Sequence, residues 1–264
     1  MNFTPTELEG YRDFAGQLAD AAAQAIMPYF RKPMAIDNKK SQAFDPVTDA
    51  DRAAERAMRE LIELHFPAHG ILGEEEENKA GSSPLTWVLD PIDGTRAFIT
   101  GYPLWGTLIA LNDGDYPVVG VMNQPFTGER FVGSPDGAFV VTGQEKTRLA
   151  TSGCQQLAEA RITCTTLDMF TDEERAAYLR VAAQARLSRY GGDCYAYCML
   201  ASGHIDAVIE SDLKPYDIQA LIPLIEAAGG IITNWQGESA ANGGAVIAAA
   251  SKELHAAILP ILKE

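Results

Sequence analysis

The stretch of sequence that decides the fold is WVLDPIDGT, which occupies residues 87–95. Its first part is apolar and predicts a short buried strand. This strand is expected to end at Asp90, because Pro91 cannot donate a hydrogen bond to a sheet. Asp93 follows three residues later, and the two residues after it predict the start of a helix. The stretch therefore predicts two carboxylates and a helix N-terminus crowded together at the carboxyl end of one strand.

Two interpretations of this stretch are open from its residues alone. Carboxylates this close together repel each other unless a cation lies between them, and Mg²⁺ prefers oxygen ligands. Backbone N–H groups at the start of a helix favour a bound anion such as a phosphate. The alternative is a surface turn followed by a helix cap, because Asp-Gly and Thr are common in both. A choice between the two depends on the rest of the chain.

Length and composition describe an ordinary globular protein. The 264 residues include 47% hydrophobic and 22% charged residues, so we expect one compact unit with a sizeable core. The net charge of −15 argues against nucleic acid or an anionic membrane as the main partner. The first residues lack the apolar core of a signal peptide, and no apolar run is long enough to span a membrane.

The four cysteines form no Cys-x-x-Cys pair. Cys194 and Cys198 fall on one face of a predicted helix, where we expect them to pack as small apolar residues rather than bind a metal. A reducing cytoplasm is the simplest location for such a chain.

The first half of the chain predicts helices followed by short strands. Helices are expected over residues 6–30 and, from an N-cap at Thr48, to about residue 66. Asp51 stands at the third position of the second helix, where its local interpretation is a capping-box partner. Residues 71–73 predict a strand that ends at Glu74, the place where open α/β sheets bind ligands. The next three glutamates are expected in a solvated loop, and an antiparallel meander is expected between residues 105 and 142.

The second half alternates strands and helices, and Asp217 begins one of these helices. We expect two halves within one compact unit, residues 1–145 and 146–264. The predicted strands are 161–164, 187–190, 206–210 and 245–249, and the predicted helices are 172–185, 191–202, 217–228 and a last one from 252.

The acidic residues singled out so far share one kind of position, because each lies where one element of the chain gives way to the next. They are Glu74, the pair Asp90 and Asp93, and Asp217. Spaced carboxylates of this kind are what a multi-metal phosphoryl-transfer site requires. The four histidines have neither ligand spacing nor a Ser or Cys partner, and glycine-rich dinucleotide and P-loop motifs are absent. These observations favour the metal and phosphate interpretation.

The same motifs resemble those of the inositol monophosphatase family, which comprises lithium-sensitive, Mg²⁺-dependent phosphomonoesterases. The resemblance rests on Gly-Glu-Glu at residues 73–75, Asp-Pro-Ile-Asp-Gly-Thr at 90–95 and Tyr-Asp at 216–217. The motif Asp-x-Val-Thr-x-x-Asp at residues 45–51 and Lys40 also match. The resemblance implies an α/β fold, the layered α-β-α-β-α sandwich of the inositol monophosphatase and fructose-1,6-bisphosphatase type, and a homodimer.

The resemblance also implies a set of metal ligands. Glu74, Asp90 and the carbonyl group of Ile92 would bind a first Mg²⁺. Asp90, Asp93 and Asp217 would bind a second, so each site would hold two or three ions.

Further roles follow from the same resemblance. Asp51, through waters, would join Glu74 at a weaker third ion. Glu74 and Thr95 would orient and deprotonate the attacking water, and the backbone N–H groups of Gly94 and Thr95 would bind the phosphate. Water would attack directly, with no phosphoenzyme, and Lys40 would be an electrostatic neighbour.

The metal motifs do not decide the substrate. Asp193 stands where family members contact the alcohol part of the substrate, and inositol phosphatases usually have an uncharged residue there. With Glu210 it would form charge-assisted hydrogen bonds to an ammonium and an imidazole, which indicates L-histidinol phosphate. Segments around residues 94–98, 104–107 and 191–197 resemble the family's histidinol-phosphate phosphatases. The alternative role for Asp193 is to cap the helix that follows. The predicted substrate-contacting residues are Asp93, Arg189, Gly192, Asp193, Cys194, Glu210 and Asp217.

Other functions stay open beside histidinol phosphatase. An inositol-1-monophosphatase or a broad phosphomonoesterase is the first alternative. A bisphosphonucleotide phosphatase is disfavoured, because a second phosphate would require more basic residues. A non-catalytic metal- or ligand-binding homologue is an alternative of another class, against which the intact acidic residues argue.

Overall fold

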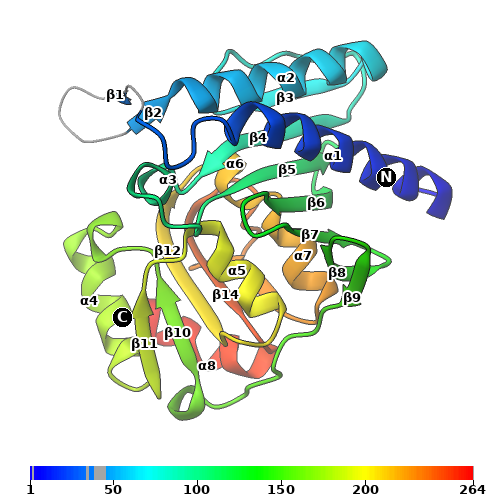
Figure 1. Cartoon of the computed structure of the whole chain (residues 1–264). Coiled ribbons are helices and arrows are strands. Elements are labelled where there is room, and N and C mark those ends of the chain that lie inside the picture. The colour runs from blue at the N-terminus through cyan, green and yellow to red at the C-terminus, as the bar shows by residue number, and fades with distance from the viewer. Residues whose placement is uncertain (2, 34–35, 39–45, 264) are drawn as a thin grey trace.

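The computed structural model describes residues 1, 3–33, 36–38 and 46–263, which form five stacked layers (Figure 1). The layers are a helix pair, a seven-stranded sheet, a set of short helices, a five-stranded sheet and a second helix pair. This arrangement confirms the predicted α-β-α-β-α sandwich. Lys40 and Asp45, two residues of the N-terminal motif, lie outside the described residues.

The first layer consists of α1 (Pro5–Ile26) and α2 (Asp49–His65), which pack on each other and on the large sheet. Both helices begin with a capping box, formed in α2 by Thr48 and Asp51 as predicted. The first helix is shorter than the predicted range of 6–30.

The large sheet is an antiparallel meander except at one edge, where β3 runs parallel to β4. Its strands follow the chain in order, so short turns connect most of them. The last strand, β9, was not predicted, because its four residues are all exposed and show no apolar alternation. The strands are β3 (Gly70–Gly73), β4 (Thr86–Asp93), β5 (Gly106–Asn112), β6 (Pro117–Gln124), β7 (Glu129–Ser134), β8 (Gly137–Thr142) and β9 (Glu145–Arg148), and a separate pair, β1 (Ile36–Asn38) and β2 (Pro46–Thr48), precedes α2.

Strand β4 does not end where the sequence predicted. Its pairing with β5 is interrupted after Asp90 and resumes at Asp93, which lies opposite Gly106. The carbonyl of Pro91 accepts a hydrogen bond from the hydroxyl of Thr107 at 2.8 Å. The prediction that pairing stops at the proline was wrong, because an irregularity lets the sheet bypass the missing N–H group.

The middle layer contains three short helices between the two sheets. The sequence predicted one helix over residues 217–228 where the structure has two, and this prediction was wrong. Pro223 explains the break, because proline has no N–H group for the carbonyl four residues earlier and its ring clashes with that carbonyl. The separate start of α6 places Asp217 in its first turn, beside β4. The helices are α5 (Asp193–Ala201), α6 (Pro215–Ile218) and α7 (Leu221–Ala227).

The small sheet is mixed. Strand β10 pairs in parallel with β11 and β12, whereas β14 pairs in antiparallel fashion with β12 and β13. Strand β11 forms one edge, and α4 and α8 cover the outer face. The elements are β10 (Arg161–Cys164), β11 (Leu187–Tyr190), β12 (Ala207–Leu213), β13 (Ile231–Asn234), β14 (Gly244–Ala249), α4 (Asp172–Ala182) and α8 (Lys252–Lys263), and the remaining helix, α3 (Thr95–Thr100), follows β4.

Three apolar cores hold the layers together, one between the outer helices and each sheet and one between the two sheets. Trp87, Tyr197 and Tyr178 are among their largest members, and each is at most 1% exposed. Each sheet therefore has apolar side chains on both faces. Within the described residues, no helix combines the length and the apolar character that a membrane span requires.

Candidate active site

Three aspartates meet at the boundary between the large sheet and the middle layer. Asp90 and Asp93 lie at the end of β4, and Asp217 lies in the first turn of α6. One carboxylate oxygen from each lies within 4.8 Å of the other two. The structure thus brings together three of the predicted metal ligands from two distant parts of the chain.

Each of these aspartates accepts one backbone N–H group, and the donors come from three different segments. The donor–acceptor distances are 3.0 Å from Ile92 to Asp90, 2.7 Å from Cys194 to Asp93 and 2.7 Å from Lys214 to Asp217. These bonds hold the carboxylates in place but supply no full positive charge. The ionised carboxylates would therefore still need a cation to neutralise them.

Burial and mutual repulsion change the acidity of the cluster. Burial, together with Glu74 and the other aspartates, raises the pKa of Asp90 well above its ordinary range. Burial and the nearby Asp193 and Asp217 do the same to the pKa of Asp93. Burial also raises the pKa of Asp217 to about 7, despite its bond to Lys214. A divalent cation would reverse these shifts by favouring the ionised carboxylates.

The donor set fits a hard divalent cation. It consists of carboxylate and carbonyl oxygens, which Mg²⁺ prefers. Asp51 adds a separate observation, because its Oδ2 caps α2 through Thr48 while its buried Oδ1 has no hydrogen-bond partner among the described residues. Burial raises the pKa of Asp51 to about 6, and the charge of Glu74 adds to that rise. The capping role and the predicted metal role thus use different oxygens of one side chain.

Two other predicted residues stand at the edges of this cluster. Glu74 follows directly after β3, and its charge raises the pKa of Asp90, after burial, more than any other neighbour does. Thr95 begins α3, and its hydroxyl group donates to the carbonyl of Ile92 at 3.1 Å. That carbonyl keeps a second lone pair for a further partner.

Gly94 lies between the acidic cluster and Asp193. It adopts a left-handed conformation with φ of 82°, which favours glycine. A Cβ atom at this position would lie 3.0 Å from the carboxyl carbon of Asp193. The predicted phosphate-binding turn therefore lies in direct contact with the predicted specificity residue.

Asp193 does not cap its helix, so the capping alternative was wrong. The N-cap of α5 is Gly192, which has no side chain, and the first N–H groups of the helix donate instead to the side chains of Thr165 and Asp93. Asp193 itself has φ of 45°, an uncommon conformation for a residue with a side chain. Burial and the nearby Glu210 raise the pKa of Asp193 to about 7, although Arg96 acts in the opposite direction.

Glu210 is 2% exposed and lies on β12. One of its oxygens accepts the N–H group of Thr165 and the other accepts the hydroxyl group of Tyr197, both at 2.9 Å. The hydroxyl group of Thr165 in turn accepts the N–H group of Asp193 at 3.1 Å. Thr165 and Tyr197 were not predicted as site residues from the sequence. Only the position of Tyr197 four residues after Asp193, one turn along the same helix, could have indicated a shared site.

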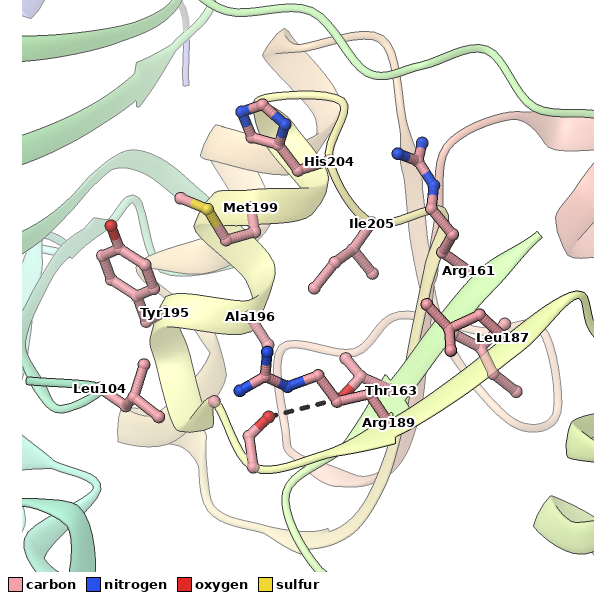
Figure 2. Close-up of a pocket in the computed structure, with 13 residues that line it drawn as sticks. Leu104, Arg161, Thr163, Leu187, Arg189, Tyr195, Ala196, Met199, His204 and Ile205 are labelled. Atoms are coloured by element: carbon pink, nitrogen blue, oxygen red, sulfur yellow. Dashed lines mark hydrogen bonds between the residues drawn. The ribbon is translucent and has the colours of Figure 1, made fainter. Parts of the chain in front are cut away.

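Figure 2 shows a neighbouring cavity of about 380 Å³ between α5, β10 and β11. Arg189 and Gly192, two of the predicted substrate residues, line it, and the Arg189 side chain extends across it toward α5. Of the described residues that line this cavity, none belongs to the acidic cluster. Arg189 is exposed and lies on the edge strand β11, so the structure does not bring it into the cluster.

Two cysteines, Cys194 and Cys198, lie on the helix α5 beside the site. Cys194 and Cys198 are free and buried, and burial raises the pKa of both thiols, so they pack as apolar residues as predicted. Cys194 also contacts the site, because its backbone N–H group donates to Asp93 at 2.7 Å and its thiol interacts with the same carboxylate, which raises the pKa of the thiol further.

Known proteins match this chain over nearly its whole length. The model of the inositol monophosphatase family matches residues 7–264. The bifunctional phosphatase IMPL2 of Arabidopsis thaliana, a chloroplastic protein, is 44% identical, and the match covers 88% of this chain but only 66% of that longer protein. A histidinol-phosphatase of Streptomyces coelicolor is 35% identical, with 98% of this chain and 99% of that protein covered. The solved structure of an inositol monophosphatase from Zymomonas mobilis has a TM-score of 0.86 and 40% identity, with 97% and 98% covered.

The layered fold, the acidic cluster and these matches define a phosphoric monoester hydrolase of a metal-dependent class. The chain belongs to the inositol monophosphatase family. Its relatives include both histidinol-phosphatases and inositol monophosphatases, so family membership alone leaves the alcohol part of the substrate open.

Proposed function

We propose that this chain hydrolyses L-histidinol phosphate to L-histidinol and phosphate, a step of histidine biosynthesis. The observation that carries the proposal is the pair of carboxylates on the alcohol side, Asp193 and Glu210. The two carboxylates lie close enough that the charge of Glu210 raises the pKa of Asp193. A substrate with an ammonium group would neutralise this pair, whereas a neutral polyol would leave it uncompensated.

The metal side supplies the chemistry that any phosphomonoester needs. In this proposal, Glu74, Asp90, Asp93, Asp217 and the Ile92 carbonyl hold two Mg²⁺ ions, with Asp51 near a third. When bound, these ions neutralise phosphate charge and make the attacking water more acidic.

The residues of the chain then divide the work. Glu74 and Thr95 orient the attacking water, and Glu74 takes its proton. The backbone N–H groups of Gly94 and Thr95 hold the phosphate oxygens. The bond from water oxygen to phosphorus forms as the bond to the alcohol oxygen breaks, and the alcohol leaves with a proton. Asp193 orients the alcohol part, and Glu210 supports Asp193.

The test is a comparison of kcat/KM for L-histidinol phosphate and inositol 1-phosphate, both with Mg²⁺. We expect histidinol phosphate to be preferred by at least about tenfold, the equivalent of one charge-assisted hydrogen bond. A tenfold preference for inositol 1-phosphate would reject the proposed substrate while leaving the phosphatase class intact.

Inositol-1-monophosphatase is the second candidate, and the Zymomonas mobilis structure, at 40% identity, favours it. A broad-specificity phosphomonoesterase would hydrolyse both substrates with similar kcat/KM. A non-catalytic homologue would release no phosphate beyond what Asp93→Asn releases, because that variant removes a proposed metal ligand.

Three further properties belong to this proposal. We expect lithium to inhibit the enzyme, as the family resemblance implies. We expect a homodimer, which is supported by the exposed edge strand β11 with Leu187 and Tyr190 on its surface. Light scattering should then give twice the chain mass of 28.5 kDa. The cytoplasmic location stays a prediction, and the four free cysteines are compatible with it.

A further inference from the structure

The buried pair Glu55 and Arg59 lies behind Glu74 and has no part in the proposed chemistry. Both residues lie on α2, and Glu55 is 0% exposed. One oxygen of Glu55 accepts two N–H groups of Arg59, at 2.8 Å and 2.7 Å. A buried carboxylate that is paired in this way still needs hydrogen-bond donors for its remaining lone pairs.

Glu55 also binds the backbone of the loop that follows Glu74. It accepts the N–H group of Glu75 at 2.8 Å and that of Glu76 at 3.1 Å. Arg59 binds the carbonyl groups of the same loop, because it donates to the carbonyl oxygens of Glu76 and Glu77, both at 3.1 Å. Two side chains of α2 therefore hold donors and acceptors of three consecutive loop residues.

The residue before Glu74 is shaped for the same contact. A Cβ atom on Gly73 would lie 2.1 Å from a carboxylate oxygen of Glu55 and 2.7 Å from Arg59. Glycine is needed here because of close approach, since no side chain fits between the end of β3 and α2. Glu74 is thus fixed to α2 through the residues on both of its sides.

The pair is also aligned with the metal side of the site. Asp51, Glu55 and Arg59 follow one another at intervals of four residues, so they lie along one face of α2. The same helix face presents the buried, unpartnered Oδ1 of Asp51 and holds the loop that carries Glu74. One rigid element therefore sets the positions of two of the proposed acidic residues.

We infer that Glu55 and Arg59 are positioning residues that set the affinity of the site for its divalent cation by fixing the backbone around Glu74. The inference rests on the metal site of the proposed function but not on the proposed substrate. Without Glu55, two N–H groups of the loop lose their buried acceptor and the loop moves toward water to regain one. Glu74 then leaves the position from which it faces Asp90.

The test is direct titration of metal-free protein with Mn²⁺ by isothermal calorimetry, with no substrate present. Glu55→Gln keeps the shape of the side chain but turns one acceptor into a donor that faces an N–H group. We expect its Kd for Mn²⁺ to rise by roughly 10- to 100-fold, as for other residues that orient a ligand from behind. Arg59→Lys keeps the charge beside Glu55 but loses the fork that reaches both carbonyls, and should give a smaller rise.

Arg56→Gln is the matched control on the same helix. Arg56 is 62% exposed, and its partner among the described residues is the side chain of Glu76, at 3.2 Å. Its Kd should stay within about twofold of the wild-type value, as is usual for exposed ion pairs. All titrations are run at a temperature at which circular dichroism shows each variant to be folded, so that a loss of stability is not mistaken for a loss of affinity.

Activity provides a second readout that a merely structural role would not give. Glu55→Gln should need more Mg²⁺ for half-maximal rate, whereas kcat at saturating Mg²⁺ recovers. Folded Glu55→Gln that binds Mn²⁺ like the wild type would overturn the inference. Wild-type protein that binds Mn²⁺ but hydrolyses neither phosphate would instead reject the proposed function, so the two failures are distinguishable.

Discussion

The proposed metal side and the proposed alcohol side of this site are both built from carboxylates, but the protein compensates these carboxylates differently. On the metal side, Asp90, Asp93 and Asp217 each accept one backbone N–H group, and one oxygen of each lies within 4.8 Å of the other two. On the alcohol side, both oxygens of Glu210 already have protein donors. The first group is therefore complete only with a cation, whereas the second holds its shape without a ligand.

The difference predicts where generality and selectivity lie. Changes on the metal side should affect every phosphomonoester alike, because they act on phosphate, water and metal. Changes on the alcohol side should alter the ratio of kcat/KM between two substrates, because they act on a group that only one substrate carries. The variants below test this division.

The largest effect is expected for Asp93→Asn. This change removes a charged ligand of the proposed second ion, so kcat should fall by roughly 10²–10³-fold. Steady-state assays should give the same factor for histidinol phosphate and for inositol 1-phosphate. A loss confined to one substrate would break the division between the two sides.

Asp193→Asn should have the next largest effect. It replaces a charge-assisted hydrogen bond with a neutral one, which costs about 1.5–3 kcal/mol, or roughly 10- to 100-fold in kcat/KM for histidinol phosphate. The rate for inositol 1-phosphate should change little. Asp172→Asn, at a carboxylate that is 97% exposed, is the matched control and should change neither rate. Equal losses on both substrates would place Asp193 with the metal side.

The acidic residues of the metal side should also make the stability of the metal-free protein depend on pH. Burial holds the folded pKa of Asp217 at about 7, against 3.8 for the free group. Between about pH 4 and pH 7 the metal-free folded protein therefore keeps a proton that the unfolded chain has lost, so its stability falls as pH rises through this window. Differential scanning fluorimetry in EDTA should show a lower Tm at pH 8 than at pH 5.

Saturating Mg²⁺ should raise the Tm at pH 8 by roughly 5 °C or more, and by less at pH 5, where protons compete with the metal. Equal Mg²⁺ shifts at the two pH values would show that the aspartates are already ionised without a cation.

The smallest effect is expected for Tyr197→Phe, which removes one donor from Glu210 but no charge. We expect a loss of about 1 kcal/mol, or roughly fivefold in kcat/KM for histidinol phosphate. Tyr195→Phe is the control. Tyr195 lies on the same helix as Tyr197, but its hydroxyl group donates to Glu129 of β7, at 2.8 Å. If both variants behave alike, the hydroxyl group of Tyr197 does not support the alcohol side.

The same division explains what the sequence could predict. The convergence of Asp90, Asp93 and Asp217 was predictable, because the first two lie in one short motif and the third lies in another motif of the same family resemblance. The hydrogen bond that Tyr197 donates to Glu210 was not predictable, because it joins α5 to β12 and depends on packing between layers. No local pattern encodes such a contact.

Local rules also failed where two of them competed. A proline at position 91 predicted the end of a strand, but pairing on both sides of it was strong enough to continue. Asp193 suited an N-cap by type, yet Gly192 took that place and left Asp193 in a strained conformation. In both cases the exception lies at the proposed site, where strain is most often retained.

The close approach of Gly94 and Asp193 bears on the distance between the phosphate and the cation of a bound ligand. A Cβ atom on Gly94 would lie only 3.0 Å from the carboxyl carbon of Asp193. The turn proposed to bind the phosphate and the carboxylate proposed to bind the cation therefore lie side by side. A ligand that uses both must carry its phosphate and its cation only a few bonds apart. In L-histidinol phosphate, two carbons separate the ester oxygen from the ammonium nitrogen. Under the proposed function, amino-alcohol phosphates of that span match this short separation.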